Sequence, residues 1–347
     1  MNNEREGDAA EGDVVRTAAG KSSSPSTIRK TRKSIQKKGC AERNKNKPHV
    51  KYNNGELIKV IKNCKQNDSI FDYIGGSYRM YFLLNRGNGV HGQTQVGCDS
   101  PGGKSAHTPF ILFESINAFE LKKHPASEPV FSTMFHMTKA NMERLYNESN
   151  FLSRGWSDEK KWKELRSDRC KLILGFVHKP EGSEDGVTSD EPNVTESVLA
   201  GGEPHLSFLQ RVHNANGTNE RTNEDRTQDV HDYLTKHALV CFVHYRLTAD
   251  YPPNEHTTIC YLYEIQIVPE FTKMGIGQHL ISMLEALCRR INVPKILCTV
   301  LKNNVKAVSF YKTKCSFQLD ESSPDNFTSD DSEEECEYEI LKRVVFS

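Results

Sequence analysis

A strand, a pair of glycines and an amphipathic helix follow one another between residues 260 and 291. Residues 260–268 are rich in β-branched and aromatic side chains, which favours a strand, and Pro269 ends it. Gly275-Ile276-Gly277 follows and opens a run of apolar residues at helical spacing. Such a glycine pair can serve merely as a tight connection. Between a strand and a long helix it favours an anion site, because the free N–H groups and the helix dipole stabilise a phosphate.

Strands and helices alternate along much of the remaining chain. The predicted strands lie at 111–121, 171–178, 238–247, 260–268, 295–301 and 338–345. The predicted helices lie at 55–66, 138–149, 276–291 and 304–311. We expect Thr138 to cap the second of these helices. This order predicts an α/β (α+β) domain with one mixed, mostly antiparallel sheet flanked by helices.

Long polar stretches surround and interrupt this domain. Hydrophobic residues make up 36% of the 347 residues, which is low for one compact globule, so we expect part of the chain to remain unpacked. Residues 1–50 form a predicted disordered, basic N-terminal arm, and 51–106 a short helix followed by a low-complexity loop. The predicted folded domain is 107–347. Its polar segment 180–236 reads as a disordered surface insertion whose removal is expected to cost little stability.

Charge and cysteine content exclude several classes of function. Lys and Arg number 46, as do Asp and Glu, so no global charge points to nucleic acid or to a membrane. The basic arm is the exception, and it predicts a nuclear import signal, a weak nucleic-acid contact or simply a solvated tail. The ten cysteines include no Cys-x-x-Cys pair, so we expect reduced thiols and no metal site. With no predicted secretory signal or membrane span, the expected location is the nucleus and cytoplasm.

Two segments resemble motifs of the GCN5-related N-acetyltransferases, the GNAT family. Residues 273–278 (KMGIGQ) resemble the loop that holds the pyrophosphate of acyl-CoA, Arg/Gln-x-x-Gly-x-Gly/Ala. Residues 304–311 (NVKAVSFY) resemble the downstream pattern Asn-x-x-Ala-x-x-Phe-Tyr. The resemblance implies a GNAT fold with acetyl-CoA as co-substrate. Thr272 stands at the first position of the loop pattern, so one side-chain contact is absent while the backbone cradle is expected to remain.

Within this family the chain resembles the N-alpha-acetyltransferase D (NatD) enzymes. The matching segments are 137–149 (MTKANMERLYNES), 261–266 (YLYEIQ), 320–324 (DESSP) and 338–341 (YEIL). NatD enzymes acetylate the N-terminal serine of histone tails that begin Ser-Gly-Arg-Gly. The resemblance therefore implies a monomeric enzyme that transfers acetyl to the α-amine of such tails. It covers about 107–179 and 237–345.

Glu264 is the candidate general base, since an α-amine with a pKa of about 8 needs only a modest base near neutral pH. Tyr261 and Tyr263 share a strand face, because strand side chains alternate, and would hold the peptide and order water. Glu264 could instead be a strand carboxylate that faces solvent, and the two tyrosines could simply pack as aromatic strand residues. Asp250 is the candidate contact for the third-position arginine, and Phe151 or Trp156 would supply a further aromatic wall. The substrate contacts implied by the resemblance are Tyr146, Asp250, Tyr263, Thr299, Ser322 and Tyr338.

The resemblance also implies the acetyl-CoA contacts. The backbone of Ile265, Gln266 and Ile267 would pair with the pantetheine arm. Asn304 would bind near the thioester, and Tyr311 would donate a proton to the departing sulfur. The predicted pyrophosphate loop consists of Lys273, Met274, Gly275, Ile276, Gly277 and Gln278.

Two other functions compete with this prediction. A lysine side-chain acetyltransferase would need a stronger base, because a lysine amine has a pKa of about 10.4. The second alternative is a catalytically dead histone-binding module, which Thr272 and the long insertions favour. The glutamate at 264 and the glycines at 275 and 277 argue against loss of catalysis.

Overall fold

The computed structural model describes residues 69–83, 109–124, 127–149, 155–179, 208, 223–327 and 336–346. All of them belong to one unit, Asn53–Ser347. The predicted arm 1–50 and the predicted helix 55–66 lie outside the described residues. The segment 51–106 was predicted to be a loop after that helix, but its described part, 69–83, contains the helix Phe71–Ile74 and the strand Met80–Phe82, so the prediction is wrong there.

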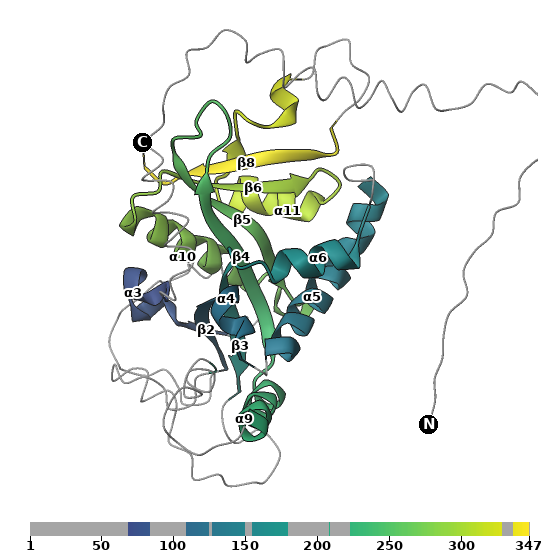
Figure 1. Cartoon of the computed structure of the whole chain (residues 1–347). Coiled ribbons are helices and arrows are strands. Elements are labelled where there is room, and N and C mark those ends of the chain that lie inside the picture. The colour runs from purple at the N-terminus through teal and green to yellow at the C-terminus, as the bar shows by residue number, and fades with distance from the viewer. Residues whose placement is uncertain are drawn as a thin grey trace, which may run out of the picture. The chain divides into compact units, whose positions relative to one another are not determined.

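The described residues form an eight-stranded sheet in the order β1-β2-β3-β4-β5-β6-β8-β7 (Figure 1). The strands are β1 Met80–Phe82, β2 Phe110–Asn117, β3 Lys171–His178, β4 Leu239–Ala249, β5 Thr258–Ile267, β6 Lys295–Leu301, β7 Gln318–Leu319 and β8 Tyr338–Val344. Neighbouring strands are antiparallel except β5 and β6, which are parallel. This mixed, mostly antiparallel sheet confirms the predicted fold class.

Helices cover both faces of the sheet. The helices are α3 Phe71–Ile74, α4 Ala118–Lys122, α5 Ser127–Ser149, α6 Asp158–Leu165, α9 Asn223–Lys236, α10 Ile276–Arg290 and α11 Val305–Ser309, which continues into a π-helical turn, Phe310–Lys314. The apolar side of α10 packs with α3 and α11 on one face, while α4, α5, α6 and α9 contribute to a second core on the other. No helix in these described ranges combines the length and apolar composition that crossing a bilayer requires.

The predicted strand 111–121 is too long. β2 ends at Asn117, whose side-chain oxygen accepts a hydrogen bond from the backbone N–H of Glu120 at 2.8 Å and so caps α4. Phe119 and Leu121 therefore lie in a helix. Asparagine satisfies a free N–H group at a helix start, and this local bond outweighs the apolar pattern that suggested a longer strand.

The predicted start of the next helix is also wrong. Helix α5 begins at Ser127, and Thr138 lies buried in its middle, where its hydroxyl donates to the carbonyl of Met134 at 2.8 Å. A hydroxyl that bonds the carbonyl four residues earlier does not cap a helix. Val130, Phe131, Met134 and Met137 supply the buried side of the earlier turns.

Helices α6 and α9 were not predicted. Helix α6 begins after Ser157, whose side chain accepts a hydrogen bond from the N–H of Lys160. Helix α9 lies within the segment 180–236 that the sequence assigned to a disordered insertion, and it buries Val230 and Tyr233. The prediction is therefore wrong for 223–236. Most of the remaining insertion lies outside the described residues.

Phe208 is a second buried residue from this segment. Its ring is fully buried, 5.2 Å from the ring of Phe176 on β3, and its N–H donates to the carboxylate of Glu114 on β2 at 2.8 Å. A deletion of 183–232 would remove both Phe208 and Val230 from the second core. We now expect such a deletion to destabilise the domain, contrary to the expectation from composition.

Phe208→Ala should lower the free energy of unfolding by about 3–5 kcal/mol, because it leaves a cavity against β3. Chemical denaturation measures this change. The matched control is Phe327→Ala, whose side chain is 55% exposed and which should change stability by no more than about 0.5 kcal/mol. Equal, small losses in both variants would show that Phe208 does not anchor the insertion.

Candidate active site

Strand β5 carries a bulge at Tyr263. The neighbouring strand pairs His244 with Glu264 but pairs the next residue, Tyr245, with Leu262, so Tyr263 has no pairing partner on β4. An extra residue in one strand shifts the alternation of faces beyond it. Leu262 packs in the core with α10, yet Glu264, two residues later, contacts α6 on the other side of the sheet. The bulge therefore turns the Glu264 carboxylate toward the layer of α5 and α6.

Strands β5 and β6 separate at the same place. Their parallel pairing ends at Leu262 and Cys298. Beyond it, Ile265, Gln266 and Ile267 pair with β4 on one edge, and no described strand pairs with their other edge. An unpaired strand edge can form backbone hydrogen bonds with an extended ligand. The three residues predicted to hold the pantetheine arm thus lie where an added strand fits.

The carboxylate of Glu264 is 6% exposed and accepts two hydrogen bonds. One comes from the ammonium of Lys161 on α6 and one from the amide of Gln266, each at 2.7 Å. Lys161 also contacts the Glu164 carboxylate at 2.9 Å. Asn141 on α5 donates to the Gln266 side-chain oxygen at 2.9 Å. The candidate base is therefore held in one orientation by a network that joins α5, α6 and β5.

Burial and nearby charges set the protonation of this network. Burial lowers the pKa of the Lys161 ammonium, but the negative charges of Glu264 and Glu164 raise it by more, so the pKa is raised overall. Burial, with the charge of Glu264, raises the pKa of Tyr146 to about 12. Burial also lowers the pKa of the His244 imidazole. At neutral pH the site therefore combines a cationic lysine with a neutral phenol and a neutral imidazole.

Several tyrosines gather beside the bulge. The rings of Tyr261 and Tyr263 lie 4.7 Å apart, so they share one face as predicted. The Tyr261 hydroxyl forms a 2.5 Å hydrogen bond with the hydroxyl of Thr299. Tyr251, which the sequence did not single out, packs edge-on against Tyr261 at 6.3 Å. Tyr263 and Tyr338 border the same small apolar cluster. These predicted substrate residues therefore lie together.

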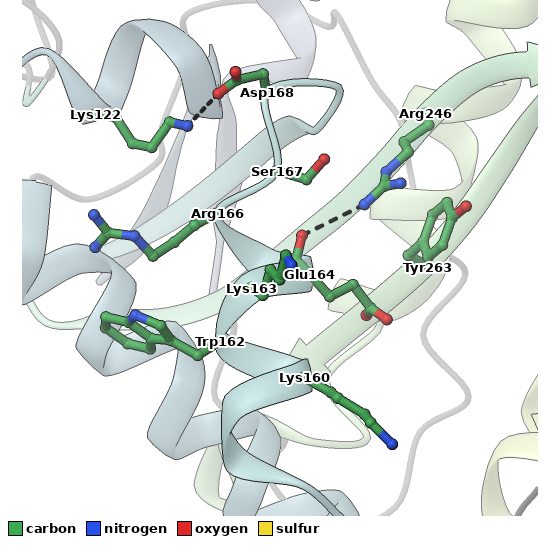
Figure 2. Close-up of a pocket in the computed structure, with 10 residues that line it drawn as sticks. All are labelled: Lys122, Lys160, Trp162, Lys163, Glu164, Arg166, Ser167, Asp168, Arg246 and Tyr263. Carbon is green, nitrogen blue, oxygen red and sulfur yellow. Dashed lines mark hydrogen bonds and ion pairs between the residues drawn. The ribbon is translucent and has the colours of Figure 1, made fainter.

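A groove between α6 and the sheet adjoins this site (Figure 2). It is lined by Lys122, Lys160, Trp162, Lys163, Glu164, Arg166, Ser167, Asp168, Arg246 and Tyr263. The Arg246 guanidinium lies over the Tyr263 ring at 4.2 Å and reaches the carbonyl of Glu164 at 3.4 Å. Basic side chains outnumber acidic ones, so the α6 side of the site is cationic.

The predicted pyrophosphate loop has the backbone that its glycine implies. Lys273 and Gly275 both have positive φ, 61° and 86°, and Gly275 is the residue before α10. The first N–H groups of a helix have no acceptor within it, which leaves them free for an anion. The Tyr81 hydroxyl, from β1, donates to the carbonyl of Met274 at 2.6 Å and holds the loop from outside.

The two resemblance motifs meet in space. A side chain at Gly277 would lie 2.9 Å from the Phe310 ring, so the glycine permits α10 to pack against the turn after α11. Asn304 caps α11, accepting a hydrogen bond from the N–H of Ala307 at 3.2 Å. Tyr311 is 7% exposed, and burial raises its pKa. The contact between Gly277 and Phe310 thus brings the glycine loop and the turn after α11 together, as the two motifs would require if both contact one co-substrate.

Asp250 does not present a free carboxylate. Its side chain is 2% exposed and contacts the ammonium of Lys295 at 2.7 Å. Lys295 also contacts Asp320 at 3.1 Å, and Asp320 accepts hydrogen bonds from the N–H and the hydroxyl of Ser322. An arginine bound at Asp250 would have to compete with Lys295. The predicted role of Asp250 in reading the substrate arginine stays a prediction.

The sequence left Phe151 and Trp156 open as the further aromatic wall, and it did not single out the residues of α6. Trp156 packs edge-on against Tyr146 at 5.6 Å, while Phe151 lies outside the described residues. Lys161 was missed, although Ser157 followed by two acidic residues is a helix-start signal. Within the described ranges, no group of three or more His, Cys, Asp or Glu side chains could hold a metal ion.

Gly275→Val should weaken acetyl-CoA binding, because a β-branched residue resists positive φ and its side chain would occupy the loop. Calorimetric titration of the folded protein measures the affinity. Gly76→Val is the matched control, since Gly76 has no positive φ and an added Cβ meets nothing within 4 Å. If both variants bind acetyl-CoA as the native protein does, the loop does not hold the pyrophosphate.

Residues 218–317 match the model of the acetyltransferase (GNAT) family. Solved structures give weaker likenesses. Naa20 of Chaetomium thermophilum, solved with a bisubstrate analogue, is 20% identical over 30% of this chain and 60% of its own, with a TM-score of 0.25. NAA60 of Arabidopsis thaliana, in complex with acetyl-CoA, is 12% identical over 67% of this chain and 98% of its own, with a TM-score of 0.31.

The ribosomal-protein-S18-alanine N-acetyltransferase of Escherichia coli is 11% identical over 68% of this chain and 94% of its own, with a TM-score of 0.32. The chain thus spans under two thirds of the length of Naa20 and most of the other two. At these TM-scores the likenesses carry no argument about substrate.

The family match runs from α9 to the turn after α11 and includes the bulged strand, the glycine loop and α10. These are also the elements that leave one edge of β5 open beside a helix start. The sheet and the family match therefore agree on a GNAT fold, with the matched segment 218–317 at its centre.

Proposed function

We propose that the protein is an N-alpha-acetyltransferase of the NatD type, which acetylates the free α-amine of chains that begin Ser-Gly-Arg-Gly. The observation that carries the proposal is the position of Glu264. Its buried carboxylate lies at the bulge, next to the open edge of β5 and close to the tyrosines. The reaction brings acetyl-CoA, which supplies the activated acetyl thioester, and the amine together in one complex.

Glu264 would accept the amine proton, directly or through water. An α-amine has a pKa of about 8 and a lysine side chain about 10.4, so the former loses its proton to a weak base far more readily near neutral pH. A carboxylate is a weak base, which suits an α-amine better than a lysine side chain. Tyr311 would donate a proton to the departing thiolate, as the family resemblance implies.

The tyrosines favour a chain end as the substrate. Tyr261 is 9% exposed, and its hydroxyl is committed to Thr299. Tyr146 and Trp156 approach the same region from α5 and the segment before α6. A first residue as small as serine would fit among such walls. The resemblance also assigns Ser322 and Tyr338 to substrate binding. Ser322 donates a hydrogen bond to Asp320, and Tyr338 is the first residue of β8.

The proposal extends to partner and location. The partners would be histone N-terminal tails, met by a monomeric enzyme in the nucleus and cytoplasm. The basic arm at 1–50, outside the described residues, would supply the import signal or a weak nucleic-acid contact.

Glu264→Gln should lower kcat about 100-fold or more, the effect expected for loss of a general base, while acetyl-CoA affinity stays near that of the native protein. Steady-state kinetics at neutral pH measure the rate. Glu159→Gln, an exposed carboxylate on the same helix as Lys161, is the control and should act at the native rate. A near-native rate for Glu264→Gln would remove this residue from the role of base.

A peptide beginning Ser-Gly-Arg-Gly should be acetylated, and the same peptide with a blocked α-amine should not, even if lysines follow. Mass spectrometry locates the acetyl group. Replacing the arginine by glutamate should lower kcat/KM about tenfold or more, or about 1.4 kcal/mol. Acetylation of lysines in the blocked peptide would favour the lysine acetyltransferase, and acetyl-CoA binding without any transfer would favour the dead module.

A further inference from the structure

Lys161 lies at the centre of the candidate site, although nothing in the sequence motifs assigns it a role. It projects from α6, 103 positions away from Glu264 in the chain. The residue is 7% exposed, and its ammonium contacts Glu264 at 2.7 Å and Glu164 at 2.9 Å. The ring of Tyr146 lies 5.4 Å from the same ammonium. A surface lysine of a polar helix would instead extend into solvent.

Burying this lysine opposes folding unless its charge is matched. Taking an ammonium and a carboxylate out of water costs several kcal/mol per ion, which only close pairing offsets. A buried pair of this kind is weak evidence for stability, and a hydrophobic pair of similar size would hold α6 to the sheet equally well. The charges therefore point to a role in the chemistry of Glu264.

The surroundings of Glu264 contain one cation at ion-pair distance among the described residues, and it is Lys161. Two other titratable groups near Glu264 are Glu164 on α6 and Tyr146 on α5. Strand β4 brings His244, which burial keeps neutral, and the turn after α11 brings Tyr311. The remaining groups are neutral or negative, so they do not stabilise an ionised carboxylate.

Gln266 and Arg246 complete the surroundings. Gln266 donates to the second oxygen of the Glu264 carboxylate, which leaves one free lone pair on each oxygen. The Arg246 guanidinium bonds the carbonyl of Glu164 and the thiol of Cys170, so it lies one step away from Glu264. Loss of Lys161 would thus leave Glu264 with an amide donor and the neighbouring carboxyl group of Glu164.

We propose that Lys161 is a positioning residue: its ammonium, 2.7 Å from the carboxylate, favours the negatively charged form of Glu264 and fixes the direction from which Glu264 receives the amine proton. The inference rests on the proposed role of Glu264 as the base. The same cation acts in a second way, since a positive charge near the bound α-amine favours its neutral, nucleophilic form. Both effects act in one direction: without Lys161, acetyl transfer needs a higher pH.

The test is the pH profile of kcat with one amine substrate for all variants. Lys161→Met should show its acid limb at higher pH by about 1–3 units, the usual effect of an opposite charge at this distance. Its rate at pH 7 should fall toward that of Glu264→Gln and recover as the pH rises. Lys161→Arg should restore most of the native profile. Lys160→Met, from the exposed neighbour on α6, should keep the native profile.

A uniformly lower rate with an unmoved acid limb in Lys161→Met would overturn the proposal, because a merely structural lysine lowers the rate at every pH. Failure of the arginine variant to restore the profile, while it folds and binds acetyl-CoA, would also count against it.

Thermal unfolding gives a readout without activity. Lys161→Met should unfold at a lower temperature than the native protein, and Lys161→Met combined with Glu264→Gln should recover part of the loss, since the second change removes the unpaired charge. Strict additivity of the two losses would contradict the pairing. If the Ser-Gly-Arg-Gly peptide proves not to be the substrate, the pH comparison is made with the amine that is acetylated, so failure of the proposed substrate and failure of this inference remain distinct.

Discussion

The bulge at Tyr263 is the constraint on which the site depends. One extra residue in β5 reverses the face of every side chain beyond it, which removes Glu264 from the core under α10 and places it among polar groups. The same distortion coincides with the end of the β5–β6 pairing. The same part of β5 therefore supplies both a buried carboxylate and an unpaired strand edge.

The carboxylate then needs a partner, and α6 provides it. Lys161 brings the only described cation at ion-pair distance from Glu264, while Gln266 and Asn141 extend the contact to α5. Such a network contributes little net stability, because desolvation of the charges offsets their attraction. Its effect is orientation, because the network holds the carboxylate of Glu264, the proposed base, in one position relative to α5, α6 and β5.

Segments far apart in the chain stabilise this arrangement from outside. Tyr81 of β1 holds the carbonyl of Met274 in the glycine loop, and Phe208 ties the long polar segment to β2 and β3. Lys295 joins Asp250 to Asp320 and thereby anchors the turn that carries Ser322. Residues that the sequence marked as loop or as substrate contacts are thus partly structural.

Local pattern was enough to determine the strands at 171–178 and 260–268 and the helix after Gly275, because apolar periodicity and glycine conformation act over a few residues. The GNAT fold was implied by the resemblance of 273–278 and 304–311 to family motifs. Local pattern misjudged 111–121, where the cap at Asn117 overrides the apolar pattern. It also missed α6, a helix with few buried residues. The face of Glu264 and its pairing with Lys161 were decided by the tertiary structure, since a bulge depends on the neighbouring strand and the ion pair on contact across 103 positions of the chain.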